Sequence, residues 1–155
     1  VHESLSQQEQ GEIELSQVAN DIYHAVLSSM VAPDLHLNTS FAVDKVLLPS
    51  QEATNIALTL NELLQNAIEH GFANRKEGTL KVSFSLVGSK GILEIQDDGV
   101  GLKPDFDLKN TDSLGLKIVQ TMVETDLGGK FELIPLKQGT CARVVVPIKR
   151  GSSNG

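Results

Sequence analysis

A line of polar side chains on one apolar segment constrains this chain more than any other feature of its sequence. Residues 61–70 read Asn-Glu-Leu-Leu-Gln-Asn-Ala-Ile-Glu-His. In a helix, Glu62 and Asn66 lie one turn apart, and His70 continues the same line at the next turn. The leucines, alanine and isoleucine between them form a core-facing side. Taken alone, this line is best explained as a solvent-exposed polar face, which is the usual position of such a stripe.

A second segment, residues 95–101, changes that interpretation. It reads Ile-Gln-Asp-Asp-Gly-Val-Gly and follows the alternating pattern of a strand. Because alternate side chains share a face, Asp97 lies on the apolar, inward face of Ile95. A buried carboxylate is costly without a hydrogen-bond donor, and the exocyclic amino group of adenine is such a donor. Gly99 and Gly101 allow the backbone to approach a flat ring closely, although an aspartate that merely caps a turn gives the same pattern.

A third segment, Ser113-Leu114-Gly115-Leu116, indicates the start of another helix. The first N–H groups of a helix have no partner within it and lie at the positive end of the helix dipole, so phosphate groups bind there readily. The simpler alternative is that Ser113 only caps the helix. Nearby lysines either add positive charge to such a site or are ordinary solvated side chains; they are Lys103, Lys109 and Lys117.

Composition and charge argue against several other classes of protein. A chain of 155 residues is long enough for one domain with its own core. Its formal net charge of −7 argues against non-specific binding to nucleic acid and against direct membrane contact, which need a basic surface. No apolar run approaches the ~20 residues that span a bilayer. The single cysteine, Cys141, excludes an internal disulfide framework and fits the cytoplasm, and its strand-like surroundings predict a buried, inert thiol.

The order of predicted elements indicates one α+β domain. We expect a two-layer α/β sandwich, in which a mixed, mostly antiparallel sheet of about five strands is covered on one face by three helices. Ser50 is the expected N-cap of the second helix, and the loop at 99–114 has the length of a lid. We expect residues 1–13 to be a polar tether, 14–149 the domain and 150–155 a disordered tail. The predicted helices are 14–31, 51–71 and 115–127, and the predicted strands are 35–43, 80–86, 92–97, 130–135 and 140–148.

Together these segments resemble a known type of ATP site. The pattern is E-L-x-x-N-A on a helix, D-x-G-x-G after a strand, a loop, and L-G-L-x-I-V on a helix, with Gly139-Thr140 near the last strand. It resembles the GHKL superfamily, which includes DNA gyrase B subunits, heat-shock chaperone ATPases, MutL proteins and sensor histidine kinases, and whose ATP-binding domain has the Bergerat-type fold. The resemblance covers roughly residues 35–148. Residues 61–72, 113–120 and 124–129 look like one subgroup of the sensor histidine kinases of two-component systems.

The resemblance implies a role for each site residue. Asn66 would place its side-chain oxygen on Mg²⁺, and Glu62 would be the general base or would orient the attacking nucleophile. Asp97 would bind the adenine amino group, helped by Thr140 through water. His70 would touch phosphate or ribose, or would only interact with the helix dipole. The implied ligands are therefore ATP and Mg²⁺, and the other residues expected to contact the nucleotide are Gly99, Gly101, Leu114, Gly115 and Leu116.

The resemblance also implies partners. His2, His24, His36 and His70 do not fit the pattern of a phosphoacceptor, which sits early in a long helix. The γ-phosphate would therefore go to a histidine on an upstream dimerisation domain, of which residues 1–13 would be the tether, and then to an aspartate of a response regulator. The full-length protein is expected to be a bacterial homodimer with a cytoplasmic kinase region, whether soluble or membrane-anchored.

Three positions depart from the histidine kinase pattern, and two other functions stay open. Ser113 replaces the first lid glycine of many members, Glu69 stands where lysine is common, and Phe106 is the only candidate for the phenylalanine box. One alternative is an anti-sigma-factor-like serine kinase, which an upstream dimerisation hairpin with a histidine would rule out. The other is a non-catalytic nucleotide-binding module, against which the retained site residues argue.

Overall fold

The computed structural model describes residues 11–148. The α-helices of this part of the chain are α2 (Leu15–Met30), α3 (Ser50–Asn66) and α4 (Leu114–Thr121). Its large sheet contains β2 (His36–Val43), β4 (Glu77–Val87), β5 (Lys90–Asp97), β6 (Lys130–Pro135) and β7 (Thr140–Pro147). Turns of π-helix, η1 (Ala67–Gly71) and η3 (Met122–Asp126), extend α3 and α4, and a 3-10 turn, η2 (Leu108–Asn110), lies in the loop before α4.

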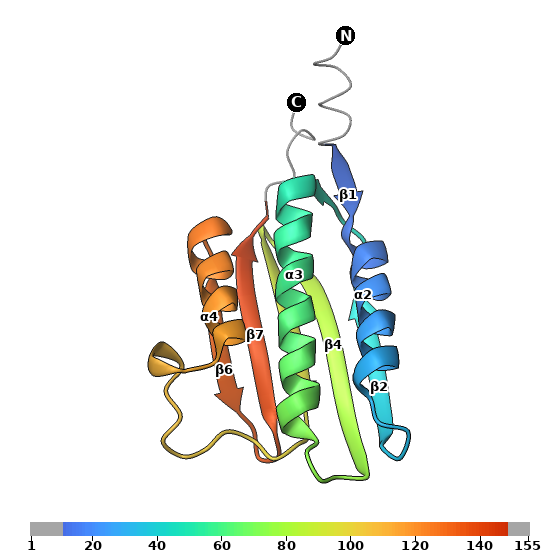
Figure 1. Cartoon of the computed structure of the whole chain (residues 1–155). Helices are drawn as coiled ribbons and strands as arrows, with labels where there is room; N and C mark the ends of the chain where they lie inside the picture. The colour runs from blue at the N-terminus through green and yellow to red at the C-terminus, as the bar shows by residue number, and fades with distance from the viewer. Residues whose placement is uncertain (1–10, 149–155) are drawn as a thin grey trace.

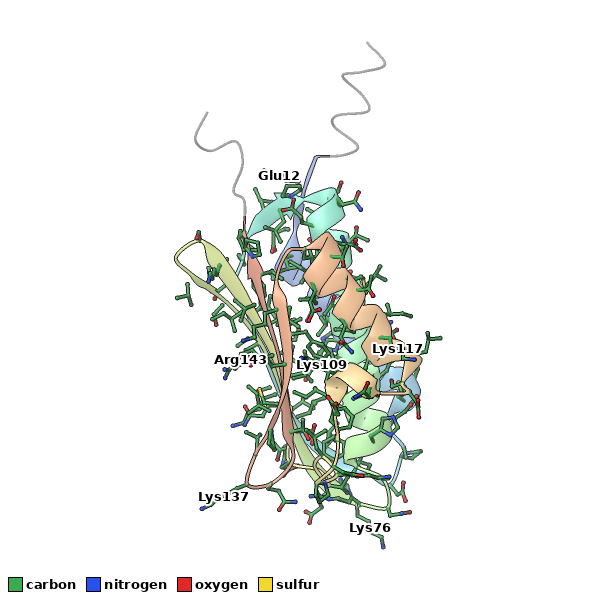
Figure 2. All side chains as sticks on the ribbon, turned by 90° about the vertical axis from the view of Figure 1, so that its left-hand side faces the viewer. Glu12, Lys76, Lys109, Lys117, Lys137 and Arg143 are labelled. Carbon is green, nitrogen blue, oxygen red and sulfur yellow. The ribbon has the colours of Figure 1, made fainter. Side chains whose placement is uncertain are left out.

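The helices stand on one face of the sheet and leave the other face open (Figures 1 and 2). In Figure 1, α3 runs along the middle of this layer, with α2 on the β2 side and α4 on the β6 side. This arrangement is the two-layer α/β sandwich that the sequence predicts, and the expected strands and helices are all present. The polar end of α3 therefore lies above one end of the central strands.

The sheet has the order β2-β4-β5-β7-β6, and only the β2–β4 pair is parallel. β4 and β5 form one hairpin, and β6 and β7 form another. In this register Asp97, the last residue of β5, lies opposite Thr140, the first residue of β7. The two residues that the resemblance assigns to adenine therefore meet at one end of the sheet.

The hydrophobic core fills the space between the helices and the sheet. Leu80, Val82 and Phe84 alternate along β4 and point inward, and each is at most 1% exposed. Leu60 and Leu64 of α3 are buried to the same extent and pack in the same core. Because burial of each such side chain contributes about 2 kcal/mol, this core fixes the position of α3 over the strands.

Two expectations from composition concern Cys141 and membrane spans. Cys141 is buried as predicted, and burial raises the pKa of its thiol. The thiol therefore stays protonated and unreactive at neutral pH. Between residues 11 and 148, no helix has both the length and the apolar character needed to cross a bilayer.

The structure corrects the prediction at the start of α3. Pro49, and not Ser50, holds the N-cap position, with a non-helical backbone (φ −52°, ψ 142°) and no capping hydrogen bond from its side chain, and Ser50 is the first helical residue. Pro49 also ends β3 (Leu47–Pro49), which pairs with β1 (Glu12–Glu14) in a second, two-stranded sheet absent from the sequence prediction. Strands of three residues are too short to give an alternating pattern.

The predicted terminal segments fall mostly outside the described residues. This holds for residues 1–10 of the expected tether, for residue 149 of the expected domain and for the expected tail at 150–155. Glu12 and Ile13 belong to β1, because their backbone pairs with β3. The folded part of the chain therefore includes the last two residues of the segment predicted to be a tether.

Candidate functional site

The polar line predicted for residues 61–70 lies where α3 ends. Glu62 and Asn66 occupy the last turns of α3, and both are half-buried. His70 lies in the π turn η1, where its side chain is 69% exposed and its Nε2 is 3.7 Å from a carboxylate oxygen of Glu69. Such wide turns often occur at functional sites. The sequence shows the helix but gives no sign of this change in its winding.

A small cavity of about 60 Å³ lies between the end of α3 and the adjoining ends of β5 and β7. Four polar side chains from three segments of the chain line it: Asn66, His70, Asp97 and Thr140. The rest of the lining is mainly apolar and consists of Leu63, Ala67, Gly71, Ile95, Gly101, Leu102, Leu133 and Ala142. Apolar walls with a few convergent polar groups are typical of a small-molecule site, and a flat heterocycle suits this composition.

Asp97 is the buried carboxylate of this cavity, with 8% of its surface exposed. Burial raises the pKa of its carboxyl above the ordinary value, while the backbone N–H groups of Gly99 and Thr140 act in the opposite direction. The Gly99 N–H donates to Oδ1 of Asp97 at 2.9 Å. An ionised carboxylate in such a setting is a strong acceptor for a donor that enters the cavity.

Close packing of glycines joins the two sides of the site. The carbonyl oxygen of Gly71, at the end of η1, accepts the Val100 N–H at 3.0 Å. A Cβ atom on Gly71 would lie 3.2 Å from Oδ1 of Asp97. Gly101 has a φ of 79°, a conformation that side chains other than glycine rarely adopt. The D-x-G-x-G segment thus lies directly against the end of the α3 helix.

The start of α4 lies beside Glu62 rather than in the cavity. A Cβ atom on Gly115 would be 2.8 Å from Oε1 of Glu62. Ser113 is the N-cap, and its Oγ accepts the Leu116 N–H at 3.2 Å. The expectation that Leu116 offers an unsatisfied N–H is therefore wrong, because the cap occupies it. Leu114 is 71% exposed at the entrance to the helix.

The loop between Gly101 and α4 has more structure than the sequence predicts. Asp107 caps the η2 turn by accepting the Lys109 N–H at 3.1 Å. Gln120 of α4 donates to the Leu108 carbonyl at 3.0 Å and ties this turn to the helix. Phe106 and Leu108 pack against the edge of the core. Lys103, Lys109 and Lys117 are all exposed on the loop and on α4, and Figure 2 labels the last two.

Two further polar residues at the site escape sequence analysis. Arg75 and Gln138 both donate to the carbonyl oxygen of Asp98, at 2.7 and 3.1 Å. They lie 23 and 40 residues from Asp98 in the sequence. Neither belongs to a recognisable motif. Only the folding of the sheet brings them to the turn that follows Asp97.

A larger hollow of about 750 Å³ lies on the open face of the sheet. An ion pair crosses it, in which Nε of Arg143 donates to Oε2 of Glu94 at 2.6 Å. None of the predicted site residues lines this hollow. We therefore identify the smaller cavity at the end of α3 as the candidate site, because the polar groups and the buried carboxylate converge there.

A metal at this site would have few protein ligands. Among residues 11–148, no group of three or more histidine, cysteine, aspartate or glutamate side chains could hold a metal ion. The amide oxygen of Asn66 is the protein ligand expected from the sequence. Such a donor set fits Mg²⁺, which is commonly bound by one or two protein oxygens together with substrate phosphates and water.

Comparison with known proteins decides the family of the chain. A sequence profile described as "Histidine kinase-, DNA gyrase B-, and HSP90-like ATPase" matches residues 51–150. The chain belongs to this family. The match includes the α3 end, the D-x-G-x-G segment and the start of α4, which form the candidate site.

Several of the similar proteins are sensor kinases. "Sensor histidine kinase PdtaS" of Mycobacterium tuberculosis (strain ATCC 25618 / H37Rv) is 31% identical over 152 residues, which cover 97% of this chain and 30% of that protein. "Blue-light-activated histidine kinase 2" of Erythrobacter litoralis is 28% identical over 115 residues, which cover 74% of this chain and 33% of that protein. The solved histidine kinase domain of the Erythrobacter litoralis EL346 blue-light-activated kinase has a TM-score of 0.81 at 26% identity, over 88% of this chain and 62% of that one.

These matches define what the chain is and how much of its relatives it represents. It is a histidine-kinase-like ATPase domain of the sensor kinase type. It covers 30% to 33% of the length of the two curated kinases. The activity and partners of a whole protein are therefore matters for proposal.

Proposed function

We propose that this domain binds Mg²⁺-ATP and transfers the γ-phosphate to a histidine on a separate dimerisation domain. The observation that supports this most is the meeting of Asn66, Asp97 and Thr140 in one small cavity at the end of α3. Glu62 lies beside the start of α4, outside the cavity. The cavity thus offers a place for the adenine ring, and the neighbouring start of α4 offers a place for the phosphates.

Asp97 is the residue proposed to recognise adenine. Its buried carboxylate already accepts the Gly99 N–H, and the exocyclic amino group of adenine would supply a further donor from the cavity. Thr140 lies opposite it in the β5–β7 register and lines the same cavity, so a water molecule held by Thr140 can complete the contact. Gly99 and Gly101 keep the backbone close to the plane of the base, and guanine, which carries an oxygen in place of this amino group, is disfavoured.

Asn66 is the proposed metal ligand, and His70 lies at the same end of the cavity, where it can contact ribose or phosphate. Mg²⁺, when bound with the nucleotide, neutralises charge on the phosphates. The amide groups of Leu114 and Gly115 at the start of α4 are the proposed phosphate contacts. Because phosphoryl transfer depends mainly on positioning and charge neutralisation, these contacts account for most of the expected catalysis.

Glu62 is the proposed general base or orienting residue. It stands one turn before Asn66 on α3 and is half-buried beside Gly115. A carboxylate here can accept a proton from the attacking imidazole or hold its ring in place, while the bond between the γ-phosphorus and ADP breaks. The half-buried position keeps Glu62 accessible to an incoming side chain.

The proposed partners follow from the kinase relatives. They are an upstream dimerisation domain with the phosphoacceptor histidine, and a response regulator that receives the phosphoryl group on an aspartate. The complete protein is proposed to be a bacterial homodimer with its kinase region in the cytoplasm. The acidic chain is not proposed to bind nucleic acid or to touch the membrane directly.

The experiment is phosphoryl transfer from γ-labelled ATP in a protein that carries this chain together with its dimerisation domain. We expect a label that is lost in acid and kept in base, as phosphohistidine is, and that disappears in the Glu62→Gln and Asn66→Ala variants. A label that resists acid and lies on serine would contradict the proposal and favour a serine kinase. Nucleotide binding without transfer to any side chain would instead indicate a non-catalytic module.

A further inference from the structure

The peptide group between Asp98 and Gly99 is hydrogen-bonded on both of its sides. Its N–H, on Gly99, donates to Oδ1 of Asp97 at 2.9 Å. Its carbonyl oxygen, on Asp98, accepts Nη1 of Arg75 at 2.7 Å and Nε2 of Gln138 at 3.1 Å. Gln138 also donates to the Gly99 carbonyl at 3.2 Å. One peptide group therefore connects a cation and a side-chain amide to the buried carboxylate of the site.

These bonds act on each other through the peptide. A donor on the carbonyl makes the N–H of the same peptide a better donor, because hydrogen bonds in a chain polarise one another. The guanidinium of Arg75 is charged, so its bond is stronger than one between neutral groups. The Gly99 N–H thereby holds one oxygen of Asp97 more firmly. This contact restricts the rotation of the carboxylate and so the direction of its second oxygen.

Two loops place the donors beforehand. Arg75 follows η1 in a turn that contains Asn74 with a φ of 62°, a conformation that asparagine tolerates better than most residues. Gln138 lies in the turn between β6 and β7, next to Gly139. A Cβ atom on Gly139 would be 2.0 Å from the Asp97 carbonyl oxygen, so this turn lies directly against the end of β5. The backbone thus presents both donors to the same carbonyl.

The Asp98 segment has its own anchor to β4. Oδ1 of Asp98 accepts the Thr79 N–H at 2.8 Å, and the Asp98 N–H donates to the Thr79 carbonyl at 3.3 Å. Arg75 is only partly buried, with 29% of its side chain exposed, and Gln138 is exposed. Loss of Arg75 or Gln138 therefore leaves the segment attached to the sheet. Their contribution is to the orientation of Asp97 more than to the integrity of the fold.

We infer that Arg75 and Gln138 are positioning residues that orient the Asp97 carboxylate for adenine. This inference rests on the proposed function, since it needs Asp97 to accept the adenine amino group. Neither residue lines the cavity, so both act through the Asp98–Gly99 peptide. The preference for the amino group depends on this orientation, whereas the contacts to phosphate do not.

The test measures the affinity for ADP and for purine riboside diphosphate, which lacks the exocyclic amino group, by calorimetry. The ratio of the two affinities reports on the contact with Asp97 alone. The variants are Arg75→Ala, Arg75→Lys and Gln138→Ala. The matched controls are Lys76→Ala and Lys137→Ala, which alter the exposed neighbours that project from the same two loops (Figure 2). Thermal unfolding of each variant checks that it folds.

For the wild type we expect ADP to bind about tenfold more tightly than the analogue, because a hydrogen bond to a charged group is at stake. Arg75→Ala and Gln138→Ala should each reduce this preference by about threefold, with Arg75→Lys in between and the controls unchanged. An unchanged preference in folded variants would overturn the inference. If the wild type shows no preference for ADP over the analogue, the proposed binding of adenine by Asp97 is wrong. That result would overturn the proposed function and not only the role of Arg75 and Gln138.

Discussion

Gly99 lies against Gly71 so closely that a Cβ atom on Gly99 would be 2.0 Å from the Gly71 carbonyl oxygen. No side chain fits between these two residues, and the obstacle is backbone that cannot move aside cheaply. The contact joins the end of the α3 helix to the segment after β5. The cavity therefore has a fixed shape only as long as residue 99 has no side chain.

Gly99→Ala is expected to separate these two segments. The clash should lower the free energy of unfolding by about 3 kcal/mol and weaken ADP binding at least tenfold, because Asp97 moves with its loop. Urea unfolding and calorimetry check the two effects. The control is Gly88→Ala, where φ is 61° but no atom lies within 4 Å of the new Cβ. Gly88→Ala should lower the free energy of unfolding by about 1 kcal/mol and leave the ADP affinity unchanged. Equal losses of ADP affinity in Gly99→Ala and Gly88→Ala would contradict this prediction.

Gly115→Ala should separate catalysis from stability. Its Cβ would be 2.8 Å from Oε1 of Glu62, which is the flexible end of a side chain and can turn away. Alanine also favours a helix over glycine, so stability should change by less than about 1 kcal/mol. Phosphoryl transfer should fall by about tenfold or more, since Glu62 is displaced. The labelled-ATP assay measures this, with Glu62→Gln for comparison, and transfer at the wild-type rate would argue against a role for Glu62.

Asp97 should make the free energy of unfolding depend on pH in a defined direction. Burial raises its pKa in the folded protein above the ordinary value of 3.8. The folded state therefore holds this proton more tightly than the unfolded state, and the contribution of Asp97 to stability falls as pH rises from about 3.8 through the raised pKa. Asp97→Asn cannot ionise, so its stability relative to wild type should increase across this window and then level off.

Urea unfolding of wild type and Asp97→Asn at a series of pH values from 3.5 to about 8 tests this prediction. A difference in stability that stays constant with pH would show that the pKa of Asp97 is not raised. The same variant should bind ADP less tightly than wild type at neutral pH. Asp97 would then be a residue whose charge costs stability and is kept for binding, a trade-off common at functional sites.

Replacement of Ser113 should weaken binding of the phosphates more than binding of adenine. Ser113→Ala removes the Oγ that accepts the Leu116 N–H at 3.2 Å, which should cost about 1 kcal/mol and loosen the first turn of α4. Because α4 is the proposed phosphate contact, ATP affinity should fall while adenosine affinity stays unchanged. Ser113→Gly should have a smaller effect on stability. The idea fails if adenosine and ATP lose affinity equally.

The strands at the site were predictable from the sequence because their signal is local. Alternation along β5 places Asp97 inward, and the strand-like run at 142–146 predicts β7, which begins at Thr140. The relation of Glu62 to Asn66 follows from helical spacing alone. Motifs of this kind predict the fold and the polar residues that line the cavity, but not most of its apolar lining.

The parts that escaped prediction depend on contacts distant in the sequence. β1 is a strand only because it pairs with β3, and its three residues carry no pattern of their own. Arg75 and Gln138 meet at Asp98 only once the strands have assembled into the sheet. From the sequence, the start of α4 is either a site for phosphate or a helix start capped by Ser113. Only the hydrogen bond from the Leu116 N–H to Ser113 Oγ shows that the cap is formed.

The central claim is that the cavity at the end of α3 binds the adenine of Mg²⁺-ATP. Calorimetric titration of the chain with ADP and a non-hydrolysable ATP analogue, with and without Mg²⁺ and with GTP as the control, tests it most directly. We predict saturable binding that prefers adenine over guanine, strengthens with Mg²⁺ and is weakened in Asp97→Asn. Binding of GTP as tight as that of the ATP analogue, or full ADP affinity in Asp97→Asn, would contradict the assignment of this site.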